Sequence, residues 1–157
     1  MNAGGASGRR RVWIAWLCVA ACVVVILGLG SAEFGASQTS RYLYPFLRWL
    51  FPDLEASTYL RLLFLLRKGA HVTEYSILGV LAFRAVFLTV RSALARVALL
   101  AFCLAATVAS VDEIHQTFLP ERTGAARDVV LDGSAALAAI SLALWMKRRA
   151  QASAAAG

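Results

Sequence analysis

Two stretches of the chain combine side chains that could bind a polar ligand or catalyse a reaction. In the first stretch, Lys68, His71 and Tyr75 are spaced i, i+3 and i+7, so a helix would place them on one face. Glu74 lies beside His71 at i+3. One predicted helix therefore offers a cation, an imidazole, a carboxylate and a phenol close together.

The second stretch reads Asp112-Glu113-x-His115-Gln116. On a helix, Asp112 reaches both His115 and Gln116, which follow it at i+3 and i+4. The chain has two histidines, and each polar stretch contains one of them. This distribution makes the two stretches the leading candidates for a functional site.

A turn and a new helix are expected after the second stretch. Pro120 would end the helix, Arg122 lies on the connecting loop, and Asp128 stands where the N-cap of the next helix belongs. Asp132 lies one turn further on. If the helices pack with alternating directions, this loop meets both polar stretches at one end of the bundle.

Phosphate binding and phosphate chemistry are two functions that these side chains could perform. Arg122 could hold a phosphate as a bidentate fork and Lys68 as a point charge. Hydrolysis would need one of the histidines, oriented by Asp112 or Glu113, as a nucleophile or general acid/base. The candidate catalytic residues are His71, His115, Asp112 and Glu113. The candidate ligand-binding residues are Lys68, Glu74, Tyr75, Gln116, Arg122 and Asp128.

Two further interpretations remain open. The two histidines and two of the nearby carboxylates could bind zinc, but their spacing is not the compact His-Glu-x-x-His pattern, and the nearby basic side chains would repel a cation. We therefore predict no metal site and no cofactor. In the purely structural interpretation, His71 pairs with Glu113 or Asp112, and Arg122 pairs with Asp128, so that the charges only clamp the helices together.

The composition indicates that lipid surrounds the helices carrying these residues. Of 157 residues, 60% are apolar and 16% are charged, with a mean hydropathy of +0.67. A soluble domain of this size would carry a charge on nearer a quarter of its residues. The net charge of +7 comes from short basic clusters outside the apolar runs. Such clusters are typical of membrane topology signals, so nucleic acid is not an expected partner.

Four apolar runs predict four spanning helices, at about residues 12–32, 70–90, 97–116 and 129–146. The first run is long enough to cross a hydrocarbon core of about 30 Å. A cleaved signal peptide is its alternative interpretation, but the run exceeds the usual apolar region of about 7–15 residues. The prediction is one all-α integral membrane domain over residues 1–157, a four-helix bundle with mobile termini at 1–8 and 151–157.

The segment between the first two runs alternates aromatic residues with arginines. Tyr44, Phe46 and Trp49 lie near Arg41 and Arg48, and residues 59–66 form a second short apolar stretch. Aromatic residues beside arginines favour the headgroup boundary, which predicts one or two interfacial helices between the first and second spans. A short re-entrant or packing segment over the bundle is the alternative.

The distribution of charge between the two ends of the bundle predicts its orientation. With alternating spans, one end holds nine basic residues and no acidic one: Arg9, Arg10, Arg11, Arg84, Arg91, Arg96, Lys147, Arg148 and Arg149. All nine acidic residues fall toward the other end, with the seven remaining basic ones. The positive-inside rule then places both termini in the cytoplasm and the polar stretches at the extracytoplasmic side.

The order of these motifs resembles the signature of the VanZ-like family of small multi-spanning bacterial membrane proteins. The matching residues are Lys68-x-x-His71-x-x-x-Tyr75, Asp112-Glu113-x-His115-Gln116, Pro120-x-Arg122, Asp128 and, after the first span, Ser37-Gln38. The resemblance covers about residues 31–146. The chain departs from the family at Glu121, Asp132 and Ala135, where the family usually has glycine, asparagine and glycine.

The resemblance implies a role in the cell envelope. The family takes its name from a member associated with teicoplanin resistance, and related members occur in envelope and surface-polysaccharide contexts. We therefore expect a multi-pass protein of the bacterial cytoplasmic (inner) membrane whose partners are membrane lipids and an anionic or phosphate-bearing envelope precursor. Its expected function is to engage an envelope lipid or lipid-linked glycopolymer precursor, with an effect on glycopeptide susceptibility. A lipid-phosphate hydrolase and a structural or accessory membrane protein are the alternatives.

Overall fold

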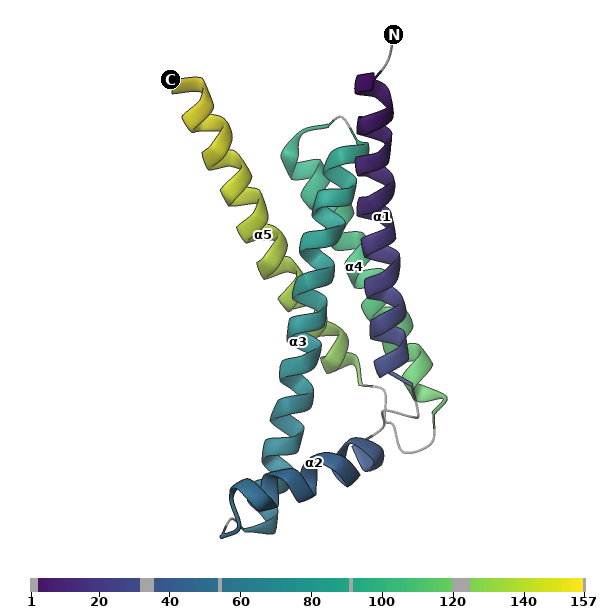
Figure 1. Ribbon diagram of the computed structural model, residues 1–157, viewed down its shortest axis with the longest axis vertical. Coiled ribbons are helices and arrows are strands. Elements are labelled where there is room, and N and C mark those ends of the chain that lie inside the picture. Colours follow the sequence, from purple (N-terminus) through teal and green to yellow (C-terminus); the bar gives the residue numbers. More distant parts are fainter. Residues whose placement is uncertain (1–2, 32–35, 54, 91, 120–124, 157) are drawn as a thin grey trace.

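The computed structural model describes residues 3–31, 36–53, 55–90, 92–119 and 125–156, which form five helices and no strand. The helices are α1 (Ala3–Leu29), α2 (Ala36–Leu50), α3 (Ala56–Thr89), α4 (Leu94–Thr117) and α5 (Ala126–Ala156), as Figure 1 shows. All except α2 are long and apolar enough to span a membrane. The predicted all-α fold with four spanning helices is confirmed. Helix also covers the described parts of both terminal segments that we expected to be mobile.

α3 is longer than the predicted second span. Its 34 residues extend about 51 Å at 1.5 Å per residue, against a hydrocarbon core of about 30 Å. Residues 59–66, predicted to be interfacial and separate from the span, are instead the first part of this continuous helix. No proline or glycine lies between Pro52 and Gly69, and the leucine-rich stretch favours helix, so the chain does not break there.

α3 is the central helix of the bundle. It contacts α1, α2, α4 and α5, and α5 also packs on α4. Figure 1 shows both chain termini at one end of the bundle, with α2 lying across the first part of α3 at the other end. Since α3 and α5 begin, and α4 ends, on the side away from the termini, the two polar stretches of the sequence meet there.

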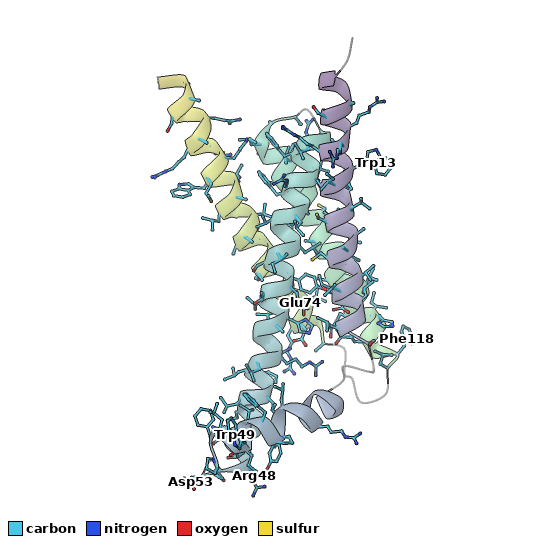
Figure 2. All side chains as sticks on the ribbon, in the orientation of Figure 1. Trp13, Arg48, Trp49, Asp53, Glu74 and Phe118 are labelled. Carbon is cyan, nitrogen blue, oxygen red and sulfur yellow. The ribbon has the colours of Figure 1, made fainter. Side chains whose placement is uncertain are left out.

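Aromatic contacts join α2 to the first part of α3. The Tyr59 hydroxyl donates a hydrogen bond to the carbonyl oxygen of Phe51, and the Tyr59 ring packs edge-on against Tyr44 with 5.2 Å between centroids. Leu47 is buried in this contact, whereas Phe46 and Trp49 are exposed. Figure 2 shows Trp49 and Arg48 at this end of the molecule. The helix that lies across the spans thus carries the aromatic and arginine side chains that favour a headgroup region.

α3 and α5 approach each other closely at Gly79. A Cβ atom on Gly79 would lie 2.8 Å from the carbonyl oxygen of Ala136 and 3.2 Å from its Cα. The absent side chain therefore allows the two backbones to touch, as small residues do where membrane helices pack. Large apolar side chains such as Leu17, Val24 and Leu99 face outward. A surface of this kind is suited to hydrocarbon.

Candidate functional site

An ion pair at the edge of the bundle joins α3 to α5. Lys68 Nζ lies 2.6 Å from Asp128 Oδ1, and the two side chains are 22% and 19% exposed. Asp128 lies in the first turn of α5, where the helix dipole also favours a negative charge. The sequence-based expectation paired Asp128 with Arg122, which lies outside the described residues. Among the described residues, Lys68 is the near partner of Asp128, and Arg127 Nε lies farther away, at 4.0 Å.

His71, one turn further along α3, contacts α5 as well. Its Nδ1 lies 3.3 Å from Asp132 Oδ2, and Asp132 is 1% exposed. The purely structural interpretation of the sequence pairs His71 with Asp112 or Glu113 of α4, and the structure differs because His71 faces α5. An asparagine, the usual family residue at position 132, could accept the same hydrogen bond through its carbonyl oxygen.

Asp132 is the site residue that the sequence interpretation did not select. A signal was available, because it is the one charged residue in the predicted span 129–146 and follows Asp128 at i+4 on the same helix face. A lone carboxylate in a spanning helix needs a polar partner. It therefore belongs with the candidate site residues.

Tyr75 links α3 to α4. Its hydroxyl donates a hydrogen bond to Asp112 Oδ2 over 3.3 Å, and both side chains are buried. The other carboxylate oxygen of Asp112 faces Gly30 at the end of α1, where a Cβ atom would collide with it. Lys68, His71 and Tyr75 thus use one face of α3 to contact two helices, as their spacing predicts.

The rest of the second polar stretch divides between the inside and the outside of the bundle. Glu113 accepts a hydrogen bond from the backbone N–H of Ala125, just before α5, and Gln116 is buried on the same side of α4. His115 is exposed, and its side chain makes no hydrogen bond or ion pair with the described residues. The reason is rotational: on a helix, His115 points about 100° away from the centre of the face shared by Asp112, Glu113 and Gln116. Its expected contact with Asp112 is not formed.

Glu74 lies at the inner end of an open groove along α3. The groove has a volume of about 650 Å³ and is lined by Leu62, Leu65, Leu66, Gly69, Ala70, Thr73 and Glu74. Figure 2 shows Glu74 part-way along the length of the molecule and Asp53 at the end where α2 meets α3. All of these lining residues belong to α3, on the face turned away from Lys68, His71 and Tyr75, and Glu74 lies between the two faces.

A comparison with models of known families finds a match over most of the chain. The model of the family described as VanZ/LLP1 matches residues 13–147. The chain belongs to the VanZ/LLP1 family. No curated protein and no solved structure matches it.

Several VanZ-family positions lie outside the described part of the chain. Arg122, the candidate phosphate ligand, and Pro120 are among them, as are the side chains of Ser37 and Gln38. The described residues of the polar stretches make four contacts between elements. Two join α3 to α5: Lys68 with Asp128, and His71 with Asp132. Tyr75 joins α3 to Asp112 of α4, and Glu113 of α4 accepts a hydrogen bond from Ala125, just before α5. This arrangement holds α3, α4 and the start of α5 together.

The described cluster is rich in hydrogen-bond acceptors. Its carboxylates are Glu74, Asp112, Glu113, Asp128 and Asp132, against the basic side chains of Lys68 and His71. Asp112 Oδ1 and Asp132 Oδ1 are buried and have no hydrogen-bond partner in the part of the chain that the structure describes. Within the described ranges, no three His, Cys, Asp or Glu side chains are grouped so as to hold a metal ion. The cluster is therefore suited to a ligand that donates hydrogen bonds.

Proposed function

We propose that this VanZ-family protein binds an envelope lipid or a lipid-linked glycopolymer precursor at the end of the bundle opposite its termini. The observation that carries the proposal is the pair of buried carboxylate oxygens, Asp112 Oδ1 and Asp132 Oδ1, that have no hydrogen-bond partner among the described residues. Buried polar atoms in native proteins are nearly always hydrogen-bonded. If these polar residues only held the helices together, α4 and α5 would not each carry a buried acceptor without a described partner.

The chemistry of the cluster indicates how such a ligand would be oriented. Hydroxyl or amine groups of a headgroup or sugar donate hydrogen bonds to Asp112 and Asp132. A phosphate is repelled by the carboxylates of the interior, so it lies at the edge near Lys68, with Arg122 as a second basic partner. Glu74 lies between the polar face of α3 and the groove on the opposite face, so it can contact a headgroup whose acyl chain lies along the groove.

Replacing Glu74 by glutamine is expected to weaken binding of the envelope lipid by about tenfold, because one charged hydrogen bond is lost at the end of the groove. The matched control is Glu55→Gln, which makes the same change at the exposed start of α3. Native mass spectrometry of copurified lipids, followed by titration with the lipid identified, measures both. Equal affinities of the two variants, or copurified lipids with the bulk composition of the membrane, would contradict the proposal.

Family membership supports a consequence for glycopeptide antibiotics. A protein that binds the precursor at the outer face changes the access of teicoplanin to it. The same two variants, expressed in a glycopeptide-susceptible host, provide the readout. The wild-type chain and Glu55→Gln should raise the inhibitory concentration of teicoplanin, whereas Glu74→Gln should not.

Localisation in the bacterial inner membrane, with both termini cytoplasmic, is part of this proposal. It is supported by the charges at the end that carries the termini, where the described helices have eight basic residues and no acidic one. In a cysteine-free background, Asp53→Cys should react with an impermeant maleimide added to intact cells. Ser92→Cys, in the α3–α4 connection, should react only after permeabilisation. The reverse pattern would place the polar cluster in the cytoplasm.

A lipid-phosphate hydrolase is the second candidate, and the His71–Asp132 contact favours it. An imidazole oriented by a buried carboxylate is the arrangement that activates histidine as a nucleophile or general base. Release of phosphate from lipid-linked phosphates by the purified protein, lost in His71→Ala and retained in His115→Ala, would support this candidate. Binding without release favours the first.

A further inference from the structure

A second apolar recess lies between α3 and α5, on the side of the Gly79 crossing that faces the termini. It has a volume of about 390 Å³. Its lining residues are Ser76, Ile77, Val80, Leu81, Ala139, Leu142, Ala143 and Met146. Figure 1 shows the reason: beyond the crossing, α5 leans away from α3 toward its C-terminal end. The recess extends about 10 Å along α5 and is open at its side, toward the hydrocarbon.

Arg84 is placed at the end of this recess. It follows Ile77 at i+7 and Val80 at i+4, so it lies on the helix face that lines the recess, one turn closer to the termini. The side chain is exposed and has no ion pair or hydrogen bond with any other described residue. A charge in a spanning helix requires a partner, and every acidic residue that the structure describes lies toward the opposite end of the bundle.

Two more basic side chains lie at the same end of the recess. Lys147 reaches from α5 to α3, where its Nζ is 4.5 Å from the centroid of the Phe87 ring. Arg149 stacks on Trp145, with its Cζ 4.3 Å from the ring centroid. An apolar slot with arginine and lysine at its end has the polarity of one phospholipid, with an acyl chain below and a phosphate above.

We propose that the α3–α5 recess is a binding site for an anionic phospholipid of the bilayer. One acyl chain occupies the recess, and the headgroup phosphate lies between Arg84 and the basic end of α5. A second copy of this chain is a poor occupant of the recess. The charged residues of its described helices at this depth are all basic, so a dimer would bring like charges together. The site is separate from the polar cluster. A lipid bound there would fill the space between α3 and α5 where the two helices diverge.

The test titrates the full chain in detergent with phosphatidylglycerol, and with phosphatidylcholine as the neutral comparison, and counts bound lipids by native mass spectrometry. Phosphatidylglycerol should bind more tightly. Arg84→Gln should weaken that binding about tenfold, the value of one charge-assisted hydrogen bond. Arg148→Gln is the matched control, since it removes the same charge at the same end but lies on the face of α5 that points away from the recess.

The apolar half of the proposal is tested independently. Ala143→Phe should fill the recess and lower the affinity for both lipids. A diazirine on an acyl chain of phosphatidylglycerol should label peptides containing residues 76–81 and 139–146 in the wild-type chain, which requires no variant to fold. Equal weakening by Arg84→Gln and Arg148→Gln, or labelling spread evenly over all spanning helices, would overturn the proposal. So would a disulfide-linked dimer of Ala143→Cys that excludes the lipid.

Discussion

Gly79→Leu is expected to lower the free energy of unfolding by about 3 kcal/mol, because the new side chain has no space at the α3–α5 crossing. The nearest atom to its Cβ would be a carbonyl oxygen of Ala136, at 2.8 Å, followed by the Ala136 Cα. These are backbone atoms and cannot rotate away, so the two helices must separate. Separation also stretches the contacts of Lys68 with Asp128 and of His71 with Asp132, which join the same two helices.

The matched control for this substitution is Gly69→Ala on the same helix. A Cβ at Gly69 meets no atom within 4 Å, and alanine is a better helix former than glycine by about 0.8–1 kcal/mol. This variant should be as stable as the wild type or more so. The midpoint of thermal or SDS-induced unfolding in detergent measures both. Wild-type stability of Gly79→Leu would mean that α3 and α5 do not approach each other as closely as described.

The spanning helices could be predicted from the sequence because apolar runs of this length have few alternatives. The extent of α3 could not be predicted from hydropathy, which falls in its first part. The absence of proline and glycine between Pro52 and Gly69 was the better signal, since it indicates continuous helix where the composition suggested an interfacial segment. Local chain-breaking residues, more than polarity, decide where this helix begins.

The partners of the polar side chains were harder to predict than their location. Spacing within α3 correctly places Lys68, His71 and Tyr75 on one face, but it does not say which helix that face meets. His71 therefore pairs with Asp132 of α5 rather than with α4. The predicted contact of His115 with Asp112 is absent for a related reason. An i+3 residue is close along the helix but rotated by about 60° from Asp112, which is enough to move His115 from the interior to the surface.

Two variants at the Tyr75–Asp112 contact are expected to distinguish ligand binding from helix packing, because one should change mainly stability and the other mainly lipid affinity. Tyr75→Phe removes the hydroxyl that donates to Asp112 Oδ2 and leaves both acceptor oxygens in place. It should lower the free energy of unfolding by about 1 kcal/mol, the typical value of one hydrogen bond, and change lipid affinity little.

Asp112→Asn makes the opposite change. The amide oxygen can still accept the hydrogen bond of Tyr75, but an NH₂ group replaces Oδ1, the buried acceptor without a partner. Stability should therefore be nearly unchanged, while affinity for the envelope lipid falls about tenfold or more, because a donor now faces a donor. Detergent unfolding and native mass spectrometry on the same two preparations give both readouts. If Asp112→Asn binds lipid as the wild type does, the unpartnered oxygen has no ligand, and the contacts of α3 with α4 and α5 serve only to hold the bundle together.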